Sequence, residues 1–78
     1  MDINFELYKI FYYVAENLSF SKAAAKLYIS QSAVSQAIKT LEDNLNIKLF
    51  FRNTKQVKLT NDGEILFRHI EQAYNLIK

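Results

Sequence analysis

The fold is decided by residues 19–45, which read SFSKAAAKLYISQSAVSQAIKTLEDNL. Serines that can cap a helix open this stretch, and an alanine-rich segment follows, so we expect a short helix from about Lys22 to Tyr28. After a short connection, Ser30 is placed to cap a longer helix over 31–45. Two helices joined by so tight a turn predict a helix-turn-helix.

The longer helix has two faces of opposite character. Its apolar stripe has the spacing that buries one side of a helix and consists of Val34, Ile38, Leu41 and Leu45. The opposite face carries hydrogen-bonding side chains without charge, namely Gln31, Ser32, Ser35 and Gln36. Glutamine can pair with adenine through two hydrogen bonds, and serine can bond several base edges. This face is therefore predicted to contact bases in the major groove of DNA.

The flanking segments complete a mostly α fold. Residues 4–17 predict a first helix, whose apolar stripe is Leu7, Phe11, Val14 and Leu18. Downstream, 49–52 and 57–60 predict two short strands that pair as a hairpin, or wing. Thr60 is placed to cap a last helix over 61–78. The expected architecture is a winged helix-turn-helix of three helices and a two-stranded wing over 1–60, followed by a long helix.

Composition excludes several classes of protein. The 78 residues are 50% hydrophobic, which suits one small domain. With no cysteine, one glycine and one histidine, the sequence predicts no zinc finger, disulfide framework, nucleotide-binding glycine loop or cofactor. The carboxylate pairs Glu42/Asp43 and Asp62/Glu64 lack a nucleophile or metal set beside them, so we expect neither an enzyme nor a metal site. No membrane span or secretory signal is visible, and a cytoplasmic location is expected.

The charge is more informative in its distribution than in its sum of +2. No acid lies between Asn17 and Leu41 or between Asn44 and Asn61, and both segments carry lysines. If they share one face, that face attracts a polyanion. Together with the caps, they predict contacts to the DNA backbone from Ser21, Lys22, Ser30, Lys39, Arg52, Asn53, Lys55 and Lys58.

Several short motifs occur in a specific order along the chain. They are SFSKAA at 19–24, ISQSAVSQAI at 29–38, LFFR at 49–52 and LTNDG at 59–63. The ordered set resembles the helix-turn-helix region of LysR-type transcriptional regulators and covers essentially the whole chain. Ser32, Gln36 and Asn46 stand where many members carry proline, arginine and glycine. These departures bear on base preference rather than on the fold, since Asn46, like glycine, can adopt the left-handed conformation that is expected to end the helix over 31–45.

The resemblance implies the partners. Members of this family are longer and sense a small molecule through a second domain, which is not expected within these residues. They dimerise through the helix that corresponds to 61–78, and a tetramer is an option for a full-length protein. The residues expected at the dimer interface are Leu66, Phe67, Ile70, Ala73, Tyr74 and Ile77. A two-fold dimer implies an interrupted palindrome with half-sites about 34 Å apart.

Two rival functions remain at this stage. The chain could be the reading head of a winged-helix regulator from another family, such as the molybdate-responsive type. It could also be a winged helix that binds proteins and has no role on DNA, in which case DNA binding would be weak and insensitive to salt. The operator, the regulated genes, the effector and the direction of regulation are not encoded in these motifs.

Overall fold

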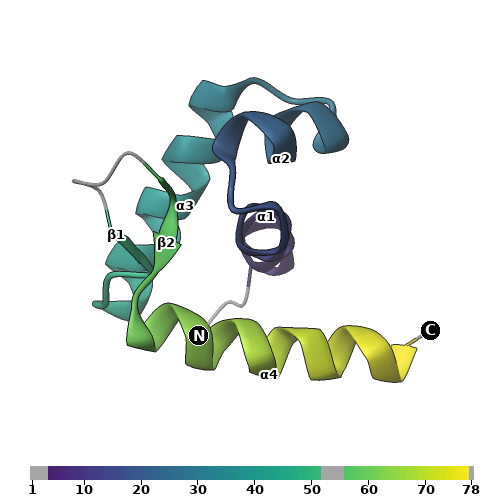
Figure 1. The fold of residues 1–78 in the computed structure, drawn as a ribbon, viewed down its shortest axis with the longest axis vertical. Helices are drawn as coiled ribbons and strands as arrows, with labels where there is room; N and C mark the ends of the chain where they lie inside the picture. The colour runs from purple at the N-terminus through teal and green to yellow at the C-terminus, as the bar shows by residue number, and fades with distance from the viewer. Residues whose placement is uncertain (1–3, 52–55, 78) are drawn as a thin grey trace.

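The computed structural model describes residues 4–51 and 56–77, with Ile77 described by its backbone alone. In chain order the elements are α1 (Phe5–Asn17), α2 (Phe20–Leu27), α3 (Gln31–Leu45), β1 (Phe50–Phe51), β2 (Lys58–Leu59) and α4 (Asn61–Ile77). In Figure 1, α1 is seen end-on, with α2 above it, α4 below it, and α3 with the hairpin to one side. The predicted winged helix-turn-helix followed by a long helix is confirmed.

Polar caps determine where the helices begin. A side-chain oxygen accepts a backbone N–H of the first turn at four positions: Asn4, Ser19, Ser30 and Thr60. The prediction that the second helix starts near Lys22 was wrong by two residues. The hydroxyl of Ser19 accepts the N–H of Lys22 at 3.1 Å, so Ser19 is the cap and Ser21 lies within the first turn.

The first three helices end in left-handed residues. The φ angles are 49° at Leu18, 59° at Tyr28 and 57° at Asn46, and only Asn46 was expected there. The prediction that Leu18 belongs to the apolar stripe of α1 was wrong, since its side chain is 51% exposed. The left-handed turn takes Leu18 off the helix, and Ile10 and Ala15 are buried on α1 as well.

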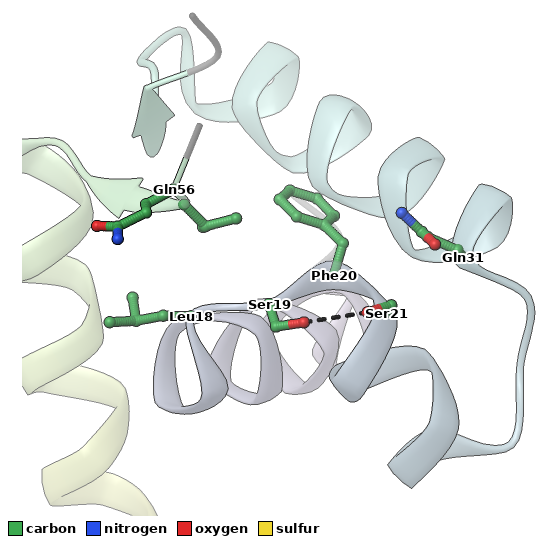
Figure 2. Close-up of a pocket in the computed structure, with 7 residues that line it drawn as sticks. Leu18, Ser19, Phe20, Ser21, Gln31 and Gln56 are labelled. Carbon is green, nitrogen blue, oxygen red and sulfur yellow. Dashed lines mark hydrogen bonds between the residues drawn. The ribbon is translucent and has the colours of Figure 1, made fainter. Parts of the chain in front are cut away.

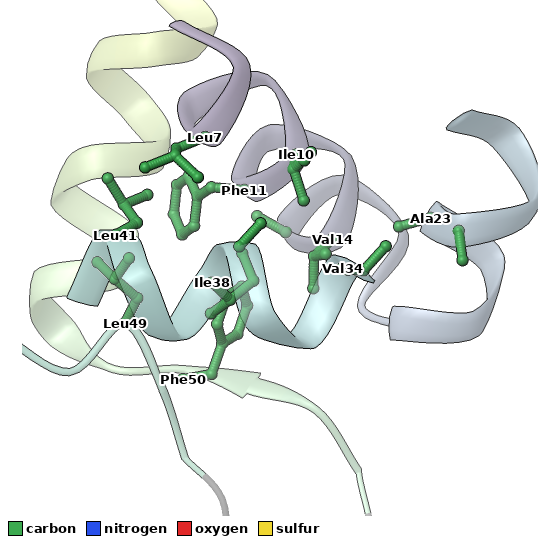
Figure 3. Packing of buried hydrophobic residues seen from close by; sticks show 13 residues of the cluster. Leu7, Ile10, Phe11, Val14, Ala23, Val34, Ile38, Leu41, Leu49 and Phe50 are labelled. Atoms are coloured by element: carbon green, nitrogen blue, oxygen red, sulfur yellow. The ribbon is translucent and has the colours of Figure 1, made fainter. Parts of the chain in front are cut away.

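The core forms where α1, α2, α3 and the base of the wing meet (Figure 3). Its largest fully buried side chains are Phe11, Phe50, Ile38, Leu41, Leu49, Val14 and Val34. The ring of Phe50 lies 5.5 Å from that of Phe11 and 5.7 Å from that of Phe20. The first wing strand is therefore anchored in the same core as the helix-turn-helix.

The wing is shorter than predicted. Phe50 pairs with Leu59 and Phe51 with Lys58 in an antiparallel ladder. Phe50 is buried and Phe51 is half exposed, as alternation along a strand requires. The loop residues 52–55 lie outside the described part of the chain.

The last helix packs back onto α1 through aromatic side chains. The ring of Tyr12 stacks on Phe67 at 5.4 Å and on Tyr74 at 5.0 Å between centroids. The Tyr12 hydroxyl donates to Glu16 at 3.2 Å, and burial, with Glu16 beside it, raises the pKa of this phenol. The last helix therefore covers the Tyr12 side of α1.

Candidate nucleic-acid interface

The outer face of α3 presents the four residues predicted to contact bases. The side chains of Gln31, Ser32, Ser35 and Gln36 are all exposed. Their spacing, with Lys39 one turn further on, places them along one side of the helix. Because Ser30 caps α3 by accepting the Ala33 N–H at 3.0 Å, this side begins at a helix N-terminus, where the helix dipole favours an anion.

A shallow hollow runs along this face. It is lined by Ser32, Ser35, Gln36, Lys39, Glu42 and Lys48. Lys48 lies beyond the end of α3 and was not among the predicted contacts. Its place in the second acid-free segment was the signal that could have found it. The exposed ammonium groups of Lys39 and Lys48 make this hollow suitable for an anionic partner.

A cleft, separate from this hollow, lies between the helix-turn-helix and the wing (Figure 2). Gln31 at the start of α3 and Gln56 in the wing lie on opposite sides, with Phe20 between them. The hydroxyl groups of Ser19 and Ser21 are 3.2 Å apart at its edge. The structure thus brings the predicted Ser21 and Gln31 together and adds Gln56, which the sequence reasoning missed.

The basic residues differ in exposure and in whether a neighbouring side chain accepts a hydrogen bond from the charged group. Lys22, Lys39 and Lys58, all predicted backbone contacts, are exposed. Lys26 is exposed too, but its ammonium group donates to the side-chain oxygen of Asn17 at 2.8 Å. The predicted contacts Arg52, Asn53 and Lys55 lie outside the described residues.

One acid of α3 has a role that the sequence did not suggest. Glu42 is only 3% exposed and is the single buried charged side chain among the described residues. Its carboxylate accepts the N–H of Leu49 at 2.8 Å and that of Phe50 at 3.4 Å. An acid near the end of a helix is usually solvated, and only the tertiary approach of the wing reveals this contact.

The predicted dimer residues divide into two groups. Leu66, Phe67 and Ile70 are half-buried and pack against the core of their own chain, and Tyr74 stacks on Tyr12. Ala73 is exposed, and the side chain of Ile77 lies outside the described residues. The large apolar side chains of α4 that face solvent most openly are Ile65 and Leu76, the latter 85% exposed, and neither was predicted.

Neither a metal site nor a membrane-spanning helix occurs among the described residues. Among residues 4–51 and 56–77, no group of three or more His, Cys, Asp or Glu side chains could hold a metal ion. Within the same ranges, no helix combines the length and apolar character needed to cross a membrane.

Comparison with known proteins identifies relatives of the whole fold. Residues 5–64 match the family described as "Bacterial regulatory helix-turn-helix protein, lysR family". The chain is 46% identical over 57 residues to the HTH-type transcriptional regulator PerR of Escherichia coli, which covers 73% of this chain and 19% of that protein. It is 40% identical over 67 residues to the glycine cleavage system transcriptional activator of the same species, covering 86% and 22%. The chain thus spans about a fifth of the length of these two relatives.

Solved structures of similar proteins share the fold of this chain. The BenM_DBD/catB site 1 DNA complex superposes with a TM-score of 0.86 at 35% identity, covering 95% of this chain and 83% of that one. Vibrio fischeri DarR in complex with DNA superposes with a TM-score of 0.87 at 28% identity, covering 99% and 26%. The motifs, the winged helix-turn-helix geometry and these matches agree: the chain belongs to the LysR family of bacterial regulatory helix-turn-helix proteins.

Proposed function

We propose that this chain binds double-stranded DNA in a sequence-specific manner, as the reading domain of a transcriptional regulator. The observation that carries the proposal is the exposed row of uncharged hydrogen-bonding side chains on α3, within which no acid is exposed. Two structural relatives are DNA complexes, and the curated relatives are transcriptional regulators rather than enzymes, which supports the proposal.

The docking follows from the shape and charge of this face. An α-helix fits the major groove, so α3 would place Gln31, Ser35 and Gln36 against base edges there. Ser21, Lys22, Ser30 and Lys39 would contact phosphates on either side of the groove. The wing would contact the backbone or the adjacent minor groove through Lys58, with Arg52, Asn53 and Lys55 of its loop as further candidates.

The assembly proposed for this chain is a homodimer through α4, bound to an interrupted palindrome. Residues 61–78 would serve as the dimerisation helix of a domain that otherwise ends near residue 60. A small-molecule effector would act only through a separate domain of a longer protein. The cytoplasm is the compartment in which such a regulator would meet DNA.

The decisive experiment separates base reading from simple attraction to DNA. A preferred site is selected from random duplexes, and affinity for it is compared with affinity for unrelated DNA. Gln36→Ala should weaken binding to the preferred site by about 1–3 kcal/mol and change binding to unrelated DNA much less. The control is Asn44→Ala, because Asn44 is exposed on α3 outside the row and outside the hollow.

Equal losses on both DNAs would show that Gln36 only positions the protein. If the unmodified chain binds DNA weakly and with little dependence on salt, the proposal fails. A winged helix that binds proteins would then be the better description.

A further inference from the structure

The strongest unassigned feature is the buried carboxylate of Glu42. This residue belongs to α3, the helix proposed to read bases, yet it is almost fully buried and its carboxylate accepts hydrogen bonds from two backbone amides of the segment that enters the wing. A buried carboxylate is costly unless hydrogen bonds compensate for its lost hydration. The site is therefore a specific connection rather than an incidental surface contact.

The contact is placed where the orientation of the wing is set. Leu49 and Phe50 lead directly into β1, and the next residue of β1, Phe51, pairs with Lys58 of β2. A shift of the Leu49 and Phe50 backbone relative to the Glu42 carboxylate would therefore also move Lys58, the exposed lysine of the wing, through its pairing with Phe51. The backbone also joins here, since the Ile47 N–H donates to the carbonyl of Glu42 at 3.2 Å.

The same segment is held from its other side by the start of α4. The Thr60 N–H donates to the carbonyl of Leu49 at 3.0 Å, and the Thr60 hydroxyl donates to the carbonyl of Lys48. These bonds join the segment that enters the wing to the start of α4 rather than to α3. Leu49 and Phe50 also pack in the apolar core beside α3, but among the described hydrogen bonds it is those of the Glu42 side chain that join α3 to the segment entering β1.

We propose that Glu42 is a positioning residue for DNA binding. Its carboxylate fixes the angle between α3 and the wing, so that Lys58 reaches a phosphate while α3 lies in the major groove. This inference rests on the proposed function, because it assumes that α3 and the wing contact one DNA molecule together.

The test compares two variants of similar length. Glu42→Gln keeps an acceptor oxygen for the Leu49 N–H, whereas Glu42→Met keeps the length of the side chain and removes the acceptor. Lys58→Ala and Lys22→Ala are each introduced into the wild-type chain and both variants. Affinity for the selected site is then measured against salt concentration, at a temperature where circular dichroism shows every protein to be folded.

In the wild-type and Glu42→Gln chains, removing either lysine should reduce the slope of log K against log salt by about 0.9, the value for one phosphate contact. In the Glu42→Met chain, Lys58→Ala should have no further effect, because the wing is already displaced. Lys22→Ala should still reduce the slope there. Hydrogen exchange at the Leu49 and Phe50 amides should be slow in wild type and Glu42→Gln, and at least tenfold faster in Glu42→Met.

The proposal is overturned if Lys58→Ala reduces the slope equally in the wild-type and Glu42→Met chains. It is also overturned if Lys58→Ala has no effect in the wild-type chain, since the wing charge would then have no contact to be positioned for. If Glu42→Met does not fold, Glu42→Asp takes its place, since it keeps the charge but is one methylene too short. A wild-type chain with no preferred site refutes the proposed function instead.

Discussion

Gly63 shows how one atom can decide the packing at the start of α4. A Cβ added at this buried position would lie 2.2 Å from the carbonyl oxygen of Leu49 and 3.0 Å from the side chain of Leu59. The first of these atoms is backbone, so it cannot move without shifting the entrance to the wing. Glycine is required here by close approach rather than by an unusual φ angle.

We therefore expect Gly63→Ala to destabilise the chain although alanine favours a helix. The loss in free energy of unfolding should be about 1–3 kcal/mol, the range for overpacking. Urea denaturation followed by circular dichroism measures it. Gln72→Ala, at an exposed position of the same helix, should leave stability unchanged or slightly higher. An unchanged midpoint for Gly63→Ala would show that the backbone of Leu49 yields easily.

Tyr28 is constrained by its backbone conformation rather than by close packing. It is 94% exposed and left-handed, so its ring packs on little while its backbone adopts a conformation that L-residues disfavour. Asparagine tolerates this conformation, so Tyr28→Asn should raise the free energy of unfolding by about 0.5–1 kcal/mol. Tyr28→Ala removes the same ring but keeps the strain, and should give no gain. Equal stability of the two variants would mean that the backbone here is not strained.

At the scale of elements, α2 offers a matched pair of lysines one turn apart. Lys22 is exposed without a described partner, whereas the ammonium group of Lys26 is engaged by Asn17. Lys22→Ala should reduce the slope of log K against log salt by about 0.9, because one phosphate contact is lost. Lys26→Ala should leave the slope near its wild-type value. Identical slopes for the two variants would remove Lys22 from the interface.

The helix-turn-helix was the most predictable element because its signals are local. A serine cap, a 3.6-residue stripe and an asparagine that can turn left-handed all act within a few residues, and Ser30, Val34 and Asn46 took their expected places. The contacts that were missed join residues distant in sequence. Nothing near Glu42 indicates that the amides of Leu49 and Phe50 will come to meet it, and Leu18 left its predicted stripe because α1 ends at Asn17.

For the whole molecule, the dimer proposed through α4 requires a face of that helix that its own core leaves free. Leu66, Phe67 and Ile70 already serve their own core, so charges placed there would unfold the monomer as well as separate a dimer. Leu76 is almost fully exposed, so a second chain could bury it without disturbing the core of the first. It is the better position at which to test assembly.

We expect Leu76→Glu to keep the fold and to shift the chain from dimer to monomer in sedimentation at micromolar concentration. Its affinity for a full palindrome should fall toward that for a half-site. Asn75→Glu adds the same charge at the neighbouring residue without removing apolar surface, and should remain dimeric. A wild-type chain that stays monomeric at high micromolar concentration, and binds half-sites as well as palindromes, would contradict dimerisation through α4.

The stack of Tyr12 between α1 and α4 has a consequence for operator spacing. A helix of 17 residues is about 25 Å long, so α4 acts as a lever whose pivot lies at Tyr12. A tilt of about 10° about the contact at Phe67 moves the C-terminal end of the helix, about 15 Å away, by about 2.6 Å, so the tilts of the two chains of a dimer can together exceed the rise of one base pair, about 3.4 Å. In a dimer joined through α4, the stiffness of these stacked ring contacts would therefore limit the spacing between half-sites. Stiffer contacts would allow both recognition helices to bind at once only over a narrower range of spacings.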